Sequence, residues 1–164
     1  MLLDAGKPVQ AKLGKFGGAP AIVEFITTFE DGNFNFQEKS NRSSAGLPKL
    51  SEEYTVSKAL ERCLMDAALA QDNYNAARTI IPSEDLWIRA AAGPEFEGRW
   101  RAVMMLPEPP TKEETEVMAD ILKRAGSGRR LADIFVSIDG RLSSVVWRCA
   151  ALLVQHGLVE TKTQ

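Results

Sequence analysis

Apolar residues recur with a helical period in several parts of the chain, the first of them between two glycine-containing turns. The spacing i, i+3, i+4, i+7 is shared by Ile22, Phe25, Ile26 and Phe29. This spacing predicts a short amphipathic helix with one buried stripe. Pro20 suits its first turn, where a missing N–H costs no hydrogen bond, and Gly32 is expected to end it. The alternation of Asn and Phe over residues 33–36 then predicts a strand with one buried face.

The residues on either side of this segment have the composition of a hairpin and of a loop. Residues 1–4 and 8–13 flank a turn in which Gly6 can adopt a positive φ. In the second strand, one face would carry Val9 and Ala11, and the other Gln10 and Lys12. Residues 38–50 are rich in Ser, Asn, Gly and Pro, and we expect a surface loop there.

A second helix is predicted from Ser51, a good N-cap, to about residue 72, followed by a shorter segment to residue 77. Its expected buried stripe comprises Val56, Leu60, Cys63, Leu64 and Ala67. Residues 86–90 and 99–104 have the composition of strands. The run Pro-Glu-Pro-Pro at 107–110 predicts a stiff joint between domains.

Three helices are predicted after this joint. Residues 111–114 fit a capping box, and the first helix has an apolar stripe of Val117, Met118, Ile121 and Leu122. The second helix carries Leu131, Ile134, Phe135 and Ile138, and ends at an Asp-Gly turn. The third runs from about residue 142 to 156, and residues 158–160 follow as a strand. This order is typical of a helix-turn-helix unit of winged-helix type.

We therefore expect an α+β protein in which a small antiparallel sheet and packed helices precede a three-helix, winged-helix-like module. The sheet and its helices would occupy residues 1–82 and a strand-rich connector residues 83–110. The winged-helix-like module would occupy residues 111–164.

Charge and cysteine content narrow the function. The net charge of −2 provides no general attraction to nucleic acid or to an anionic membrane. Cys63 and Cys149 lie in helical apolar patterns, which favours two reduced core thiols over a disulfide. The first residues lack the pattern of a secretory signal, and no apolar run approaches the ~18 residues of a membrane helix. We expect a cytoplasmic protein.

Residues 5–37 resemble the PATAN domain (also catalogued as DUF4388) of bacterial signalling proteins. The resemblance rests on glycines and aromatic residues at fixed spacing: Gly6-Lys7-Pro8-Val9-Gln10-Ala11, Gly14, Gly17 and Glu30-Asp31-Gly32-Asn33-Phe34-Asn35-Phe36. Members often carry a C-terminal helical module that ends in a strand like residues 157–159. The family domain usually opens with further helices and a strand, so the resemblance implies a partial domain completed by a partner or a second copy. It also implies a non-catalytic adaptor in two-component, chemosensory or motility signalling.

Candidate catalytic and metal-binding groups are few. His156, the one histidine, is placed to act as a cation at a helix C-terminus. One histidine and two separated cysteines do not compose a zinc site or a nucleophile–base set. The glycines at 14–18 lack the Lys-Ser/Thr of a phosphate-binding loop. An anion site at residues 126–130 is conceivable, although a helix stop followed by solvated charge is the preferred interpretation. We expect no enzyme and no cofactor.

The interpretation that we favour is a cytoplasmic adaptor that contacts response regulators or other signalling proteins. It would self-associate through the incomplete N-terminal sheet. Tryptophan and arginine are enriched in interfaces, so the candidate contact residues are Lys7, Arg129, Arg130, Trp147 and Arg148. Alternatively, the tryptophans at 87, 100 and 147 fill the seam between the two modules.

A DNA-binding regulator is the main alternative function. The third helix would then expose Arg141, Ser143, Ser144, Trp147, Arg148 and Gln155, with Arg129 and Arg130 on phosphates. Residues 111–164 hold eight Lys/Arg and seven Asp/Glu, a difference of +1, which offers few phosphate contacts. With one strand after the helix, a two-stranded wing is not expected. A small-molecule sensor with a pocket under the hairpin is a third possibility, without a dedicated set of polar residues.

Overall fold

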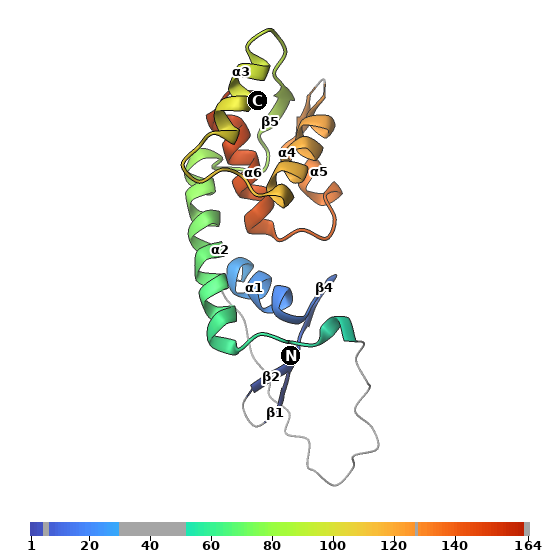
Figure 1. Ribbon diagram of the computed structural model, residues 1–164. Coiled ribbons are helices and arrows are strands. Elements are labelled where there is room, and N and C mark those ends of the chain that lie inside the picture. The colour runs from blue at the N-terminus through green and yellow to red at the C-terminus, as the bar shows by residue number, and fades with distance from the viewer. Residues whose placement is uncertain (5–6, 30–51, 127, 163–164) are drawn as a thin grey trace. The chain divides into compact units, whose positions relative to one another are not determined.

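The computed structural model describes residues 1–4, 7–29, 52–126 and 128–162 (Figure 1). Within these residues, helices combine with antiparallel sheets of two or three strands, which confirms the α+β class. The chain divides into two compact units, Met1–Leu69 and Ala70–Gln164, which are described separately. The predicted strand at 33–36, the loop at 38–50, and the caps at Gly32 and Ser51 lie outside the described residues.

Two short hairpins begin the N-terminal unit. In the first, β1 (Leu2–Asp4) pairs antiparallel with β2 (Lys7–Gln10), as predicted. The second, between β3 (Lys12–Leu13) and β4 (Phe16–Gly17), was not predicted. Because the chain leaves one hairpin and enters the next around Ala11, the expected alternation along residues 8–13 is not kept: Pro8 and Ala11 are buried, and Val9 is half-buried.

The predicted helix that follows is α1 (Gly18–Thr28), and its existence is confirmed. The predicted buried stripe is wrong in part, because the buried face includes Ala21, Ile22 and Val23. Phe29 is 54% exposed, and its ring stacks on that of Phe25 with centroids 5.0 Å apart. The two aromatic rings therefore contact each other, which a helical period alone does not reveal.

Gly17 and Gly18 allow residues 53–55 to pack directly against the start of α1. A Cβ atom on Gly17 would lie 2.4 Å from the carbonyl oxygen of Glu53, and one on Gly18 would lie 2.7 Å from that of Thr55. Gly18 also has a φ of +62°, which an L-residue with a side chain rarely adopts. The same segment is held by backbone hydrogen bonds from Ala11 N–H to the Tyr54 carbonyl and from Val56 N–H to the Val9 carbonyl.

The long helix α2 spans Leu60–Ile80. Its predicted start is wrong, because residues Glu52–Tyr54 form a 3₁₀ turn and Val56 is buried in a non-helical segment. The predicted end near residue 72 is also wrong, since the helix continues without interruption. Of its predicted stripe, Cys63 and Ala67 are fully buried, whereas Leu60 and Leu64 are exposed.

A three-stranded antiparallel sheet in the order β6–β5–β7 lies in the C-terminal unit. Its central strand is β5 (Trp87–Ala90), between β6 (Arg129–Arg130) and β7 (Val159–Lys162). The strand predicted at 86–90 is confirmed, but the strand predicted at 99–104 is wrong.

That second segment belongs to α3 (Phe96–Met104). Phe96, Trp100 and Val103 recur at i, i+4 and i+7 and pack against the core of the C-terminal unit. Residues 83–110 therefore contribute a central strand and a core helix to this unit, and they do not form a separate connector.

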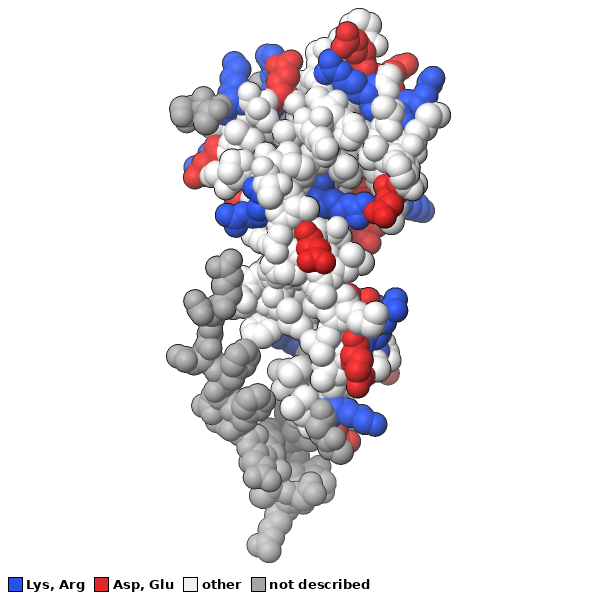
Figure 2. Space-filling view, turned by 90° about the vertical axis from the view of Figure 1, so that its left-hand side faces the viewer, with Lys and Arg blue, Asp and Glu red and all other residues white. Residues whose placement is uncertain are grey.

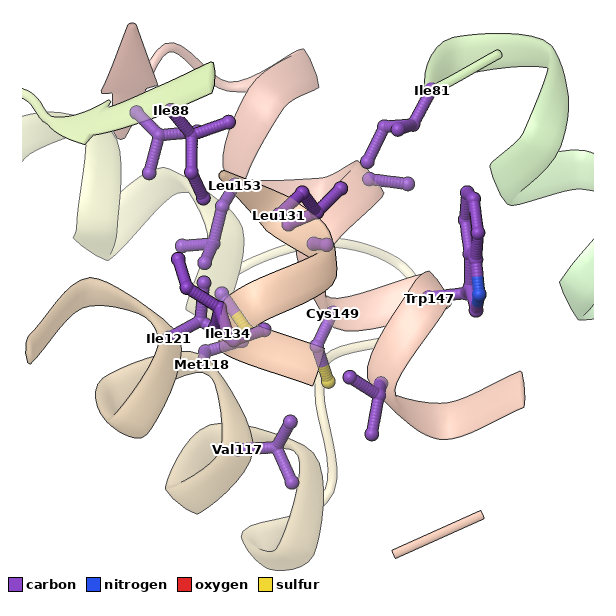
Figure 3. Packing of buried hydrophobic residues seen from close by; sticks show 14 of the residues in the cluster. Ile81, Ile88, Val117, Met118, Ile121, Leu131, Ile134, Trp147, Cys149 and Leu153 are labelled. Atoms are coloured by element: carbon purple, nitrogen blue, oxygen red, sulfur yellow. The ribbon is translucent and has the colours of Figure 1, made fainter. Parts of the chain in front are cut away.

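The three predicted C-terminal helices are α4 (Lys112–Ala125), α5 (Leu131–Ser137) and α6 (Ser143–Gln155). The capping box is confirmed: Glu114 N–H donates to the Thr111 hydroxyl at 3.2 Å, and Thr111 N–H donates to the Glu114 carboxylate at 2.8 Å. Side chains from all three helices meet in one core (Figure 3). Its fully buried large residues include Ile81, Ile88, Met118, Ile121, Leu131, Ile134, Leu153 and Leu158.

Candidate functional site

The proposed recognition helix, α6, is enclosed by the rest of its unit. Among its thirteen residues, all of which are described, Gln155 alone is exposed. Ser144 and Trp147 were expected on an outward face and are 4% and 3% exposed, so this part of the prediction is wrong. This helix packs against α4, and the apolar side chains of α6 lie around most of its circumference. It therefore has no polar face to present.

Trp147 is a core residue and does not contribute to the surface. Its ring meets those of Tyr74 and Phe135 edge-on, with centroids 5.5 and 5.2 Å apart. The Arg78 guanidinium lies over the indole, 5.5 Å from the ring centroid. Aromatic pairs in this geometry stabilise a core beyond the area that they bury. Trp87 and Trp100 are half-buried in the same unit.

Arg148 and Arg141 each bind carboxylates of α4. The Nε atom of Arg148 lies 3.3 Å from the Glu114 carboxylate, and the two side chains are 28% and 9% exposed. Arg141 contacts Glu113 at 2.8 Å and Glu116 at 3.1 Å. Both arginines thus connect the start of α4 with α6 or the residues just before it. Because their guanidinium groups already bind carboxylates, they are poorly placed to neutralise a phosphate.

Arg129 and Arg130 form the edge strand β6, and both are exposed. Arg130 lies 3.3 Å from Asp133 and 3.7 Å from Asp85. The amides that follow, at the start of α5, are already hydrogen-bonded: Leu131 N–H donates to the Leu86 carbonyl, and the next amide to the Glu84 carbonyl. The anion site considered for residues 126–130 therefore lacks these two donors.

Lys7 is exposed on β2, opposite Asp4, in the N-terminal unit. The other four candidate contact residues belong to the C-terminal unit. Of these four, Arg129 and Arg130 are exposed, Arg148 is ion-paired and Trp147 is buried. The five predicted residues do not form one site within either unit.

Both cysteines are free and fully buried, as predicted. Burial raises the pKa of the Cys149 thiol to about 12, and the nearby Glu114 carboxylate adds to the increase. The thiol donates to the Glu114 carbonyl oxygen at 3.4 Å. His156 occupies the C-cap position of α6. Among the described residues, no cluster of three or more His, Cys, Asp or Glu side chains could bind a metal ion.

An open groove of about 520 Å³ lies between α4 and the turn after α5. Its lining mixes acidic and basic side chains: Glu116, Asp120, Asp139, Lys123 and Arg141. Arg141 is held there by its ion pairs with α4. The groove therefore has neither a strong net charge nor a convergent set of polar groups of the kind that orient a small ligand.

The surface that sequence reasoning missed is the outer face of α2. Leu60, Leu64, Met65 and Leu69 are 36%, 50%, 64% and 64% exposed. On the same helix, the smaller residues Cys63, Ala67 and Ala70 are buried. Figure 2 faces the side on which α2 lies in Figure 1, and uncharged residues, drawn in white, are interrupted there by scattered charged side chains. The sequence did contain a signal for this surface, because apolar residues lie all around this helix. The sequence analysis predicted only one buried stripe and did not consider the other apolar residues.

No family model matches this chain, and comparisons with curated proteins and with solved structures gave no significant match. In the part of the chain that the structure describes, no helix is long and apolar enough to cross a membrane.

Proposed function

We propose that this protein is a non-catalytic adaptor that acts through protein–protein contact. The observation that carries the proposal is the outer face of α2, where four large apolar side chains are exposed on one helix. Large apolar side chains exposed in such a group are typical of interaction sites. The buried face of the same helix already anchors it, so the exposed residues are not needed for its own packing.

Three observations favour this function over a DNA-binding regulator. A helix-turn-helix protein reads DNA with side chains exposed on its second helix, whereas α6 exposes Gln155 alone. The arginines nearest to α6 are bound to carboxylates of α4. Arg130 has two carboxylates within 4 Å, which lowers its contribution to phosphate binding.

The signalling context of the proposal comes from the resemblance of residues 5–37 to the PATAN domain. We propose a cytoplasmic protein of a bacterial two-component, chemosensory or motility system, with response regulators or other signalling proteins as partners. Self-association is also part of the proposal.

The first test measures fluorescence anisotropy of labelled random-sequence duplex DNA against the full chain, from low to physiological salt. The proposal expects no binding even at low salt. Binding that is tight at low salt and falls steeply as salt rises would overturn it in favour of the DNA-binding function.

The second test measures capture of purified response regulators by the immobilised full chain. Leu64→Glu and Met65→Glu should abolish capture, because a carboxylate would have to be desolvated in an apolar contact. The matched control is Val136→Glu, since Val136 is 87% exposed on α5 and lies outside α2. Equal loss with all three variants, or capture unaffected by any, would contradict the assignment of this surface.

A further inference from the structure

The turn between α5 and α6 brings two reactive groups into contact. Asp139 and Gly140 lie in this turn, and both are exposed. The Gly140 N–H donates to Oδ1 of Asp139 at 3.0 Å. Because Oδ1 is bonded to the carboxyl carbon Cγ, the amide nitrogen of Gly140 lies beside a carbon that it can attack. Groups that are held in contact in this way react faster than groups that must first find each other.

The glycine leaves this nitrogen accessible. Gly140 has a φ of +74°, a conformation that residues with a side chain rarely adopt. Apart from its neighbours in the chain, nothing lies within 4 Å of the position that a Cβ atom would occupy there. Among the described residues, no backbone carbonyl accepts from the Gly140 N–H. The amide is therefore neither shielded by a side chain of its own nor part of a helix or a strand.

We infer that Asp139 isomerises spontaneously through a cyclic imide that it forms with Gly140. The nitrogen of Gly140 bonds to Cγ of Asp139 and gives up its proton, and one oxygen of the protonated carboxyl group leaves as water. Water then adds to one of the two carbonyl carbons of the five-membered imide and opens it. Addition at Cγ restores aspartate, whereas addition at the main-chain carbon gives isoaspartate, in which the main chain runs through Cβ and Cγ. The sequence needs no oxidant, and the one water that it releases is taken up again.

Other aspartates of the same unit lack this geometry. Asp133 and Asp120 lie inside α5 and α4, and side chains in a helix point towards its N-terminus, away from the next amide. Their carboxylates are also bound by arginines, Arg130 at 3.3 Å and Arg124 at 3.1 Å. We therefore expect no isomerisation at these two positions. A second Asp-Gly pair, at residues 31–32, lies outside the described residues.

The modification would change the turn and the groove beside it. Isoaspartate adds one carbon atom to the main chain just before Arg141, whose guanidinium group lies 2.8 Å from Glu113 and 3.1 Å from Glu116. Asp139 and Arg141 both line the groove beside α4. The extra atom should shift Arg141 away from its partners, and the isomerised chain should melt at a lower temperature. This inference does not depend on the proposed function.

Peptide mapping of the full chain after long incubation at physiological temperature, in a mildly acidic buffer, is the first test. Trypsin releases residues 131–141 as one peptide, which contains both Asp133 and Asp139, and it separates this peptide from residues 31–32. The inference expects a second form of the peptide with the same mass and a different retention time. Electron-transfer fragmentation should place the isoaspartate at residue 139, and an isoaspartyl methyltransferase should methylate this form. No second form, or equal rearrangement at residues 133 and 139, would overturn the inference.

Three variants separate the chemistry from general damage. Asp139→Glu keeps the charge but would need a six-membered ring, so rearrangement at this position should disappear. Gly140→Ala crowds the nitrogen and disfavours the left-handed conformation, which should slow the reaction roughly tenfold. Asp139→Asn forms the same imide with loss of ammonia and should react faster than the wild-type chain, because a neutral amide needs no prior protonation. Wild-type rates in the first two variants, or an unreactive third, would contradict the mechanism. Circular dichroism checks that each variant is folded.

A comparison of folded and unfolded chains tests the contribution of the structure. If the turn holds the nitrogen against the carboxyl group, the native chain should isomerise at residue 139 at least as fast as the same chain in guanidinium chloride. A native chain that is protected, and reacts only when unfolded, would show that the Asp-Gly sequence alone is responsible and that the inference from the turn is wrong.

Discussion

The guanidinium group of Arg99 donates a hydrogen bond to the carbonyl oxygen of Gly157, 2.7 Å away. The contact joins α3 to the turn between α6 and β7, two segments 58 residues apart in sequence. The same arginine is bound to Glu95, the N-cap residue of α3, with the two charged groups 2.5 Å apart. Gly157 has a φ of +64°, and a Cβ atom there would lie 2.9 Å from Nη1 of Arg99.

Gly157→Ala is therefore expected to destabilise the C-terminal unit. The left-handed conformation alone costs an L-residue about 1–2 kcal/mol, and the new methyl group would also displace the Arg99 side chain. Urea denaturation followed by tryptophan fluorescence measures the loss. The control is Gly98→Ala in the middle of α3, where a Cβ atom meets nothing within 4 Å. That change should be neutral or stabilising by up to ~1 kcal/mol. Equal stability of both variants would contradict the strain at Gly157.

The capping box at the start of α4 gives a second prediction. Thr111→Ala removes the hydroxyl that accepts from Glu114 N–H and should cost about 1 kcal/mol of unfolding free energy. Thr111→Ser keeps an acceptor and should restore most of the loss. Chemical denaturation measures both variants. Similar losses for the two changes would show that the methyl group, and not the hydrogen bond, stabilises this end of the helix.

The contact of Gly17 and Gly18 with residues 53–55 gives a third prediction. Gly17→Ala and Gly18→Ala should push this segment away and expose the amides of Ala11 and Val56, which donate across the contact. Amide hydrogen exchange should accelerate at these two positions, while protection in α4 and α6 stays unchanged. Gly14 also has a positive φ, but nothing lies within 4 Å of its Cβ position. Gly14→Ala should therefore strain the backbone locally and leave the exchange at Val56 much closer to that of the wild type.

Cys149 gives a prediction about pH. Because burial raises its pKa from the usual 9.0 to about 12 in the folded chain, the folded state binds the thiol proton more tightly than the unfolded state. The resulting stability is complete below pH 9 and is lost as the pH rises towards 12. Cys149→Ala should remove this component of the alkaline decline in unfolding free energy. Thiol labelling at pH 8 should be slow in the native chain and fast in urea, and rapid native labelling would contradict the burial.

Local features of the sequence were enough to predict the C-terminal helices. Thr111 and Glu114 define the start of α4 through contacts only three residues apart, and Gly126 and Gly157 follow helices that end where expected. Residues 96–104 show the limit of such reasoning. Their aromatic and apolar residues suit a strand by composition, but Phe96, Trp100 and Val103 pack on the core only when the segment is helical.

Whether the candidate site residues are buried or exposed depends on contacts between residues far apart in the sequence, which no local pattern contains. Trp147 was placed on the surface because it lies beside the apolar stripe of α6, yet Tyr74 and Phe135 cover it. Tyr74 comes from a helix that begins more than eighty residues before α6. Leu64 was predicted to be buried and is exposed. The helix was predicted to begin too early, and its buried face is lined by smaller residues such as Ala67 and Ala70.

The position of β5 at the centre of its sheet has a consequence for biosynthesis. Arg89 in β5 pairs with Glu160 in β7, 71 residues further along the chain. Loop closure over such a distance is slow compared with helix formation. As the chain leaves the ribosome, β5 emerges well before β7, the strand with which it forms its longer pairing. Until β7 follows, the apolar face of β5 and one of its hydrogen-bonding edges are open to other chains, so the nascent protein should depend most on chaperones in the interval between the synthesis of these two strands.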